Sequence, residues 1–246
     1  MSLENYGQQN LTWRDDFTVS LMQNAGSDEM VIMAAKVSTH ASKSADLSDF
    51  TLEGSQKFID FLMKNRHGSP FEHGLMTFQI EAPIFVWREF MRHRIGHSYN
   101  EQSGRYMEML PVFYMPPTHR PLVQVGKPGA YQFVPGTEEQ YSLLEEAFEQ
   151  SVSLAWASYQ DMLAGGIAKE VARQILPLNI YSSAYVTVNP RSLMSFLSLR
   201  TKDEMSVFPS YPQWEIEQVA LGQQEVFADL YPITFESFDK FGRVAP

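Results

Sequence analysis

The chain has 246 residues, of which 44% are hydrophobic and 20% are charged, proportions that suit a globular protein with a sizeable core. Its formal net charge of −10 argues against broad binding to nucleic acid or to an anionic membrane surface, because both need a basic face. It contains no cysteine, which excludes disulfides, thiolate metal sites and every mechanism with a cysteine nucleophile.

The sequence shows no sign of a membrane or export segment. No apolar run approaches the length of a transmembrane helix, and residues 1–16 lack the basic-then-apolar pattern of a signal peptide. We therefore expect a cytoplasmic protein that binds neither membrane nor nucleic acid.

The first half of the chain alternates strand and helix patterns. Residues 75–82, for example, place Met76, Phe78 and Ile80 on one side of a strand and polar residues on the other. The patterns predict, in chain order, a strand over 17–24, a helix over 28–37 capped by Ser27, a helix over 54–68, the strand over 75–82 and a helix from Pro83 to about Arg92. The segment that follows this last helix is expected to be a loop.

The second half is expected to be mainly helical. It begins with a Pro-rich connector over 111–136, after which residues 137–140 have the form of a capping box. The patterns then predict a long helix ending at Gly165, a short helix around Val171, a strand over 180–188, a helix from Pro190 to Arg200 capped by Asn189, and a helix from Pro212 to about Leu230. No repeat or linker divides the chain, so we expect one domain over residues 1–246, with helices surrounding a small sheet.

Common catalytic and cofactor motifs are absent. Neither G-x-G-x-x-G nor G-x-x-x-x-G-K-[ST] occurs, so a bound nucleotide or flavin would not sit on a Rossmann or P-loop turn. Four histidines leave a metal-dependent hydrolase open, although the motif H-E-x-x-H is missing; they are His67, His73, His93 and His97. Ser103 would act as a nucleophile only with a histidine as its base, and a hydroxyl that hydrogen-bonds a ligand or a turn is the favoured interpretation.

Residues 92–106 concentrate cations in an otherwise acidic chain. Arg92, Arg94 and Arg105 are interleaved there with serine, asparagine and glutamine side chains. Arginine forks match phosphate groups bidentately, and neutral polar side chains supply the contacts that fix a base or a ribose. The segment therefore predicts a site for an anionic small ligand, either in an enzyme or in a non-catalytic nucleotide-binding protein.

The sequence "RHR" at 92–94, followed by "SYNEQSGRY" at 98–106, resembles the signature of the flavin-dependent thymidylate synthases (ThyX). Further similar blocks run in the family's order: "HGSPFEH" (67–73), "EAPIFVWREF" (81–90), "EVARQILPLNIY" (170–181), "TVNPRSLMSFLSLR" (187–200) and "QWEI" (213–216). The resemblance implies an α+β fold with a central, mostly antiparallel sheet surrounded by helices, and not a Rossmann fold.

The resemblance also implies an activity and its partners. Enzymes of this family are methyltransferases that use FAD and no metal, and they convert dUMP to dTMP with methylenetetrahydrofolate as one-carbon donor and NADPH as reductant. They are homotetramers whose active sites form between subunits. Reduced flavin replaces the thiolate that the unrelated class of thymidylate synthase uses, which agrees with the absence of cysteine from this chain.

By resemblance, each motif position has an expected role. The positions expected to bind FAD are His67, Ser69, Arg92, His93, Arg94, Glu101, Asn189, Arg191 and Ser195. The positions expected to bind dUMP are Glu89, Phe90, Met91, Arg92, Glu101, Gln102, Ser103, Gly104, Arg105, Arg173 and Arg200. Arg200 is expected to be catalytic by stabilising uracil ionised at N3, a role that suits a side chain that stays protonated.

The chain departs from the family pattern at three places. Eight residues (95–102) separate RHR from Ser103, whereas a spacing of seven residues is commoner in the family. Glu89 stands where glutamine is frequent, and Ser195 replaces a common asparagine. On a helix from Pro190, Ser195 shares a face with Arg191, whereas Arg200 lies about half a turn out of phase with Arg191. We therefore expect flavin-contacting groups and Arg200 on opposite sides of this helix.

Overall fold

The computed structural model describes residues 10–38, 51–127 and 130–246. By their contacts, the described residues divide into two compact units, a larger one within 17–81, 86–101 and 183–246 and a smaller one within 10–16, 82–85 and 102–182. The sequence prediction of one domain over 1–246 stays a prediction. None of the described helices is long and apolar enough to cross a membrane.

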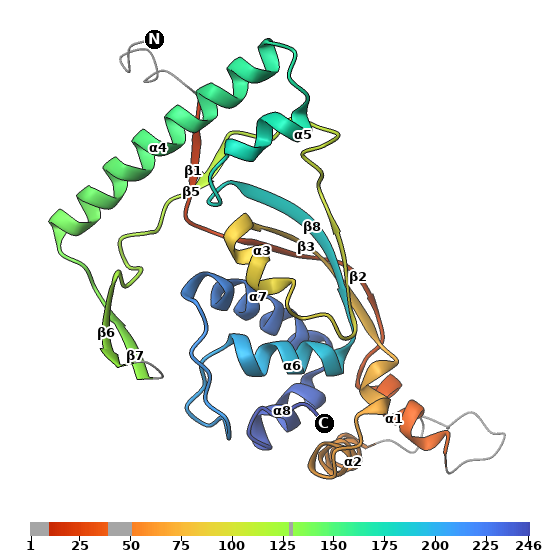
Figure 1. The fold of residues 1–246 in the computed structure, drawn as a ribbon. Helices are drawn as coiled ribbons and strands as arrows, with labels where there is room; N and C mark the ends of the chain where they lie inside the picture. The colour runs from red at the N-terminus through yellow and green to blue at the C-terminus, as the bar shows by residue number, and fades with distance from the viewer. Residues whose placement is uncertain (1–9, 39–50, 128–129) are drawn as a thin grey trace. The chain divides into compact units, whose positions relative to one another are not determined.

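A four-stranded sheet forms the framework of the larger unit (Figure 1). Its strands are, in order, β2 (Thr18–Ala25), β3 (Leu75–Pro83), β8 (Tyr181–Val188) and β4 (His97–Glu101). β2 runs antiparallel to β3, and β4 runs antiparallel to β8. β3 alternates buried apolar residues with half-buried ones, as its sequence predicts. The antiparallel sheet and the helices beside it confirm the predicted mixed α and β fold class.

Helices account for most of the rest of the larger unit. They are α1 (Asp28–Lys36), α2 (Leu52–Lys64), the 3₁₀ helix η3 (Ser69–Glu72), α3 (Ile84–Phe90, which begins in the smaller unit), α6 (Pro190–Arg200), α7 (Trp214–Leu230) and α8 (Pro232–Lys240). Buried Asp28 joins α1 to the start of α8, where its carboxylate accepts hydrogen bonds from the N–H groups of Ile233 (2.8 Å) and Thr234 (2.9 Å). These contacts satisfy helix-end donors that would otherwise be buried without partners.

The smaller unit packs one long helix over short strands. Its elements are β1 (Thr12–Arg14) parallel to β5 (Val112–Tyr114), the hairpin β6 (Val123–Lys127) and β7 (Ala130–Val134), α4 (Glu138–Ala164), α5 (Lys169–Ala172) and the 3₁₀ helix η4 (Arg173–Ile175). Phe113, Trp156 and Tyr159 are central to its core. Leu143 and Leu154 on α4 are 68% and 44% exposed, whereas Val152 and Trp156 are buried. The core is therefore built on the C-terminal half of α4.

The structure corrects several boundaries and one assignment. Residues 97–101 form strand β4, not a loop, because their backbone pairs along the edge of β8. The Pro-rich connector contains β5, β6 and β7, and the helix after Leu230 was missed. α2 begins at Leu52, where the Thr51 side chain accepts a hydrogen bond from the Gly54 N–H (3.1 Å). Pro83 ends β3 and does not open a helix.

Candidate functional site

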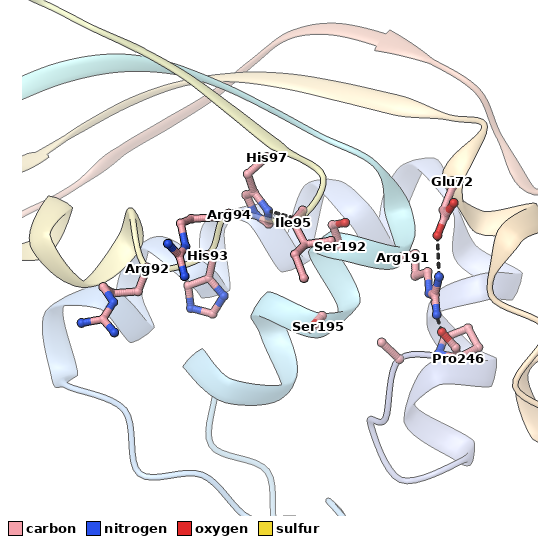
Figure 2. A pocket seen from close by; sticks show the side chains of 11 residues that line it. Glu72, Arg92, His93, Arg94, Ile95, His97, Arg191, Ser192, Ser195 and Pro246 are labelled. Carbon is pink, nitrogen blue, oxygen red and sulfur yellow. Dashed lines mark hydrogen bonds and ion pairs between the residues drawn. The ribbon is translucent and has the colours of Figure 1, made fainter.

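A pocket of about 550 Å³ lies in the larger unit (Figure 2). Its walls come from η3, from the turn after α3, from the first half of α6 and from the C-terminal segment. The lining residues are Glu72, Arg92, His93, Arg94, Ile95, His97, Arg191, Ser192, Ser195, Ala245 and Pro246. This volume falls in the range of small-molecule and cofactor sites.

The turn after α3 carries the first cluster of cations. The N–H of His93 donates to the carbonyl oxygen of Phe90 (3.0 Å), so the chain turns tightly where α3 ends. The hydroxyl of Tyr99 on β4 donates its single proton to the carbonyl oxygen of His93 (2.6 Å), and the carbonyl oxygen of Phe90 lies 3.1 Å from the same hydroxyl. Burial raises the pKa of Tyr99, so its hydroxyl stays a donor. Strand β4 therefore fixes the backbone that presents Arg92 and Arg94 to the pocket.

The start of α6 lies directly against this turn. Asn189 caps α6 by accepting a hydrogen bond from the N–H of Ser192 (2.8 Å). Gly96 has a φ of +67°, and a Cβ atom there would lie 2.1 Å from the Ser192 hydroxyl oxygen. Only glycine allows both this backbone angle and this approach. The close approach brings the first turn of α6 to the pocket wall.

The pocket is rich in positive charge. Arg191 donates to the Glu72 carboxylate (2.5 Å) and to the carbonyl oxygen of Pro246 (2.6 Å). For the guanidinium groups of Arg92 and Arg94, the described part of the chain supplies neither a hydrogen bond nor an ion pair. Two arginines without a counter-ion among the described residues suit an anionic ligand.

His97 adds a polar atom that lacks a partner. Its Nδ1 lies 3.1 Å from the carbonyl oxygen of Ile95, which fixes Nδ1 as the protonated nitrogen. Its Nε2 is buried and has no hydrogen-bond partner among the described residues. Burial lowers the pKa of His97, so the ring favours its neutral form with Nε2 unprotonated.

Arg200 ends α6, about half a turn out of phase with Arg191. Its Nε donates to His93 Nε2 (3.0 Å), and its Nη1 lies 3.2 Å from the Glu89 carboxylate. Burial, helped by the charges of Arg200 and His97, lowers the pKa of His93 to about 4, so this imidazole is neutral at pH 7. His93 thus joins the pocket on one side to Arg200 on the other.

The remaining sequence-predicted residues of the larger unit do not line this pocket. His67 is exposed with its ring edge against Phe61, Ser69 begins η3, and Glu101 ends β4. Phe90 is 1% exposed and packs on Phe196 with ring centroids 4.6 Å apart, so its side chain belongs to the core. Met91, which follows α3, and Asn189 also lie outside the lining.

A second group of predicted residues gathers in the smaller unit: Gln102, Ser103, Gly104, Arg105 and Arg173. The Ser103 hydroxyl accepts a hydrogen bond from the N–H of Arg105 (3.3 Å). A Cβ atom on Gly104 would lie 3.1 Å from the Arg173 side chain. Arg105 pairs with Glu170 at 2.8 Å, with both side chains about half exposed. Ser103 thus closes a turn in the structure, and Gly104 lets Arg173 approach it.

Comparison with known proteins decides the family. A family model described as thymidylate synthase complementing protein matches residues 20–233. A flavin-dependent thymidylate synthase from Streptomyces coelicolor is 53% identical over 233 residues, which cover 95% of each chain. The chain belongs to the flavin-dependent thymidylate synthase family. Another enzyme of that name, from Tropheryma whipplei, is 54% identical over 231 residues, 94% of this chain and 95% of that one.

Solved structures agree with this assignment. The UMP/dUMP methylase PolB from Streptomyces cacaoi, bound with 5-Br UMP, is 42% identical to this chain, with a TM-score of 0.89. The match covers 97% of this chain and 100% of PolB. Both compact units therefore belong to the fold of this family.

The pocket fits the anionic flavin that the family resemblance implies. Arg92, Arg94 and Arg191 would hold its phosphate groups. The described residues contain no cluster of three or more metal-ligating side chains.

Sequence reasoning missed several pocket residues: Glu72, Ile95, His97, Ser192, Ala245 and Pro246. Glu72 lies inside the block "HGSPFEH". Its negative charge, opposite to that of the later arginines, is the sequence feature that could have predicted an ion pair with one of them. His97 had been considered only as a metal ligand. No sequence pattern connects Pro246 to Arg191, because their contact spans 55 positions.

Proposed function

We propose that this protein is a flavin-dependent thymidylate synthase that converts dUMP to dTMP. Two findings support the proposal: 53% identity to an enzyme of that name over 95% of both chains, and a cationic pocket built from the RHR segment and α6. The chain has no cysteine, so it cannot attack uracil with a thiolate. When bound, the flavin supplies the hydride transfer that amino-acid side chains do not perform.

The side chains of the chain have binding and electrostatic roles in this proposal. Arg92, Arg94 and Arg191 hold the anionic cofactor, with Glu72 setting the direction of Arg191. Arg200 holds negative charge on the uracil ring, because a guanidinium stays protonated and presents a planar set of donors. The turn 102–105 and Arg173 bind dUMP. Within that turn, the Ser103 hydroxyl orients the nucleotide and does not act as a nucleophile.

The co-substrates and assembly belong to the same proposal. Methylenetetrahydrofolate donates the one-carbon unit, NADPH reduces FAD, and four copies of the chain share active sites at their interfaces. The experiment is anaerobic mixing of the purified, flavin-loaded protein with NADPH and methylenetetrahydrofolate, with and without dUMP, followed by chromatography for dTMP. Absence of dTMP from a fully loaded protein would contradict the proposal.

UMP is a second candidate substrate, because PolB, which is named a UMP/dUMP methylase, aligns over 97% of this chain. The higher identity to enzymes named thymidylate synthase favours dUMP. Parallel reactions with UMP and dUMP at equal concentration decide between them. We expect the larger kcat/KM with dUMP.

A further inference from the structure

The guanidinium of Arg200 is held on two of its sides. Its Nε–H points to His93 Nε2 (3.0 Å) and its Nη1 to the Glu89 carboxylate (3.2 Å). The described residues give its Nη2 no hydrogen bond, although the Arg200 side chain is only 18% exposed. We infer that His93 is a positioning residue for Arg200. The neutral imidazole of His93 accepts the Nε–H of Arg200 and so fixes the plane in which Arg200 offers its free N–H groups to the nucleotide.

Hydrogen-bond chemistry defines the state of His93. Arginine has no lone pair to offer, so His93 Nε2 must be the unprotonated acceptor and Nδ1 must carry the proton. Two charged or titratable groups face this ring, Arg200 from α6 and His97 from β4, and Glu89 lies beyond the guanidinium. With burial, both neighbours favour the neutral ring, which agrees with its role as acceptor.

One contact orients the His93 ring and another holds its backbone. Phe196 on α6 meets it edge-to-face, with ring centroids 4.8 Å apart and planes at 79°. Phe196 precedes Arg200 by four residues, so one face of α6 supplies both contacts to His93. The Tyr99 hydroxyl holds the His93 carbonyl oxygen at 2.6 Å. Neither the ring nor its backbone therefore has freedom to follow Arg200, and Arg200 must align to His93.

This alignment has a functional consequence. Glu89 by itself would draw the guanidinium into an ion pair and leave its remaining donors without a defined direction. A flat side chain that must meet a flat pyrimidine loses on the order of 10²-fold in rate when it is misplaced by about 1 Å. His93 sets that direction in the absence of the nucleotide, which spares the ordering cost when the nucleotide binds.

The first test compares His93→Gln with His93→Asn, each in the wild-type and in the Arg200→Ala background. The amide of glutamine reaches the position of Nε2, whereas that of asparagine falls short. Because His93 also lines the pocket, rates are compared on protein saturated with FAD. We expect His93→Asn to lower kcat for dTMP formation by 10- to 100-fold and His93→Gln to lower it less. In the Arg200→Ala background, His93→Asn should have no further effect. Equal losses in the two backgrounds, or losses that follow flavin content, would refute the inference.

The second test does not depend on activity, so its failure is distinct from failure of the proposed function on which the inference rests. Nitrogen-15 NMR of histidine-labelled protein, assigned with His93→Gln, reports the tautomer and the pKa of His93. We expect an Nδ1–H tautomer with a pKa near 4, and a higher pKa in a folded Arg200→Ala protein, because a neighbouring cation has been removed. An Nε2–H tautomer, or a pKa that ignores Arg200, would overturn the assignment.

Discussion

Replacing Arg92 and Arg94 with alanine tests how the pocket holds its cofactor. Both side chains line the pocket, and both lack a counter-ion among the residues that the structure describes. A hydrogen bond to a charged group contributes about 1.5–3 kcal/mol, and exposure of these side chains favours the low end. Two such contacts contribute about 3 kcal/mol, which corresponds to roughly 150-fold weaker flavin binding in the double variant.

The assay is fluorescence titration of FAD into the apo-protein, beside the flavin-to-protein absorbance ratio of the purified variant. We expect a folded but pale double variant, and a wild-type affinity that falls as salt is raised, because the contact is ionic. Arg88→Ala is the matched control: Arg88 is exposed, lies one turn earlier on α3 and is not a lining residue. Wild-type affinity in the double variant, or equal weakening by Arg88→Ala, would refute the assignment of these arginines.

Four further predictions concern single positions. Ser103→Ala should lower dTMP formation about ten-fold without abolishing it, since a neutral hydrogen bond contributes about 0.5–1.5 kcal/mol; complete loss with intact ligand binding would restore Ser103 as a nucleophile. Arg200→Ala should lower turnover by about 10²–10³-fold, with partial rescue by Arg200→Lys, whereas a purely structural helix-end cation would change only the melting temperature. Asp28→Ala should lower the free energy of unfolding by about 1–3 kcal/mol in urea titrations while flavin content is unchanged, because it strands buried donors of α8. His93 has a lower pKa in the folded than in the unfolded protein, so the free energy of unfolding should decrease as the pH is lowered from about 6.5 to 4. Urea titrations at these two pH values should show a smaller decrease for His93→Gln than for the wild type.

The sequence predicted the fold where local patterns were strong. The alternation in 75–82 and the Asn189-Pro190 start of α6 appear in the structure at nearly the expected residues. Strand β4 was missed because its sequence, "HSYNE", is polar, and only pairing with β8 makes it a strand. Hairpin β6–β7 was missed because prolines dominate the surrounding segment.

The site shows the same division between local and long-range information. The RHR segment predicted a cationic site, and the structure places Arg92, His93 and Arg94 together on a pocket wall. The phase of α6 predicts opposite sides for Arg191 and Arg200, and the two side chains have different partners in the structure. The contact between Arg200 and His93 spans 107 positions, and no periodicity within either segment encodes it.

The central claim is that this chain methylates dUMP through a flavin without a cysteine nucleophile. The most direct measurement is single-turnover anaerobic chemistry: protein loaded with flavin, reduced by NADPH, mixed with methylenetetrahydrofolate and dUMP, and quenched for quantification of dTMP beside the flavin absorbance. The account predicts that dTMP appears together with reoxidised flavin, and that neither forms at that rate without dUMP. A flavin that reoxidises with no dTMP formed, or a purified protein that binds no flavin, would contradict it.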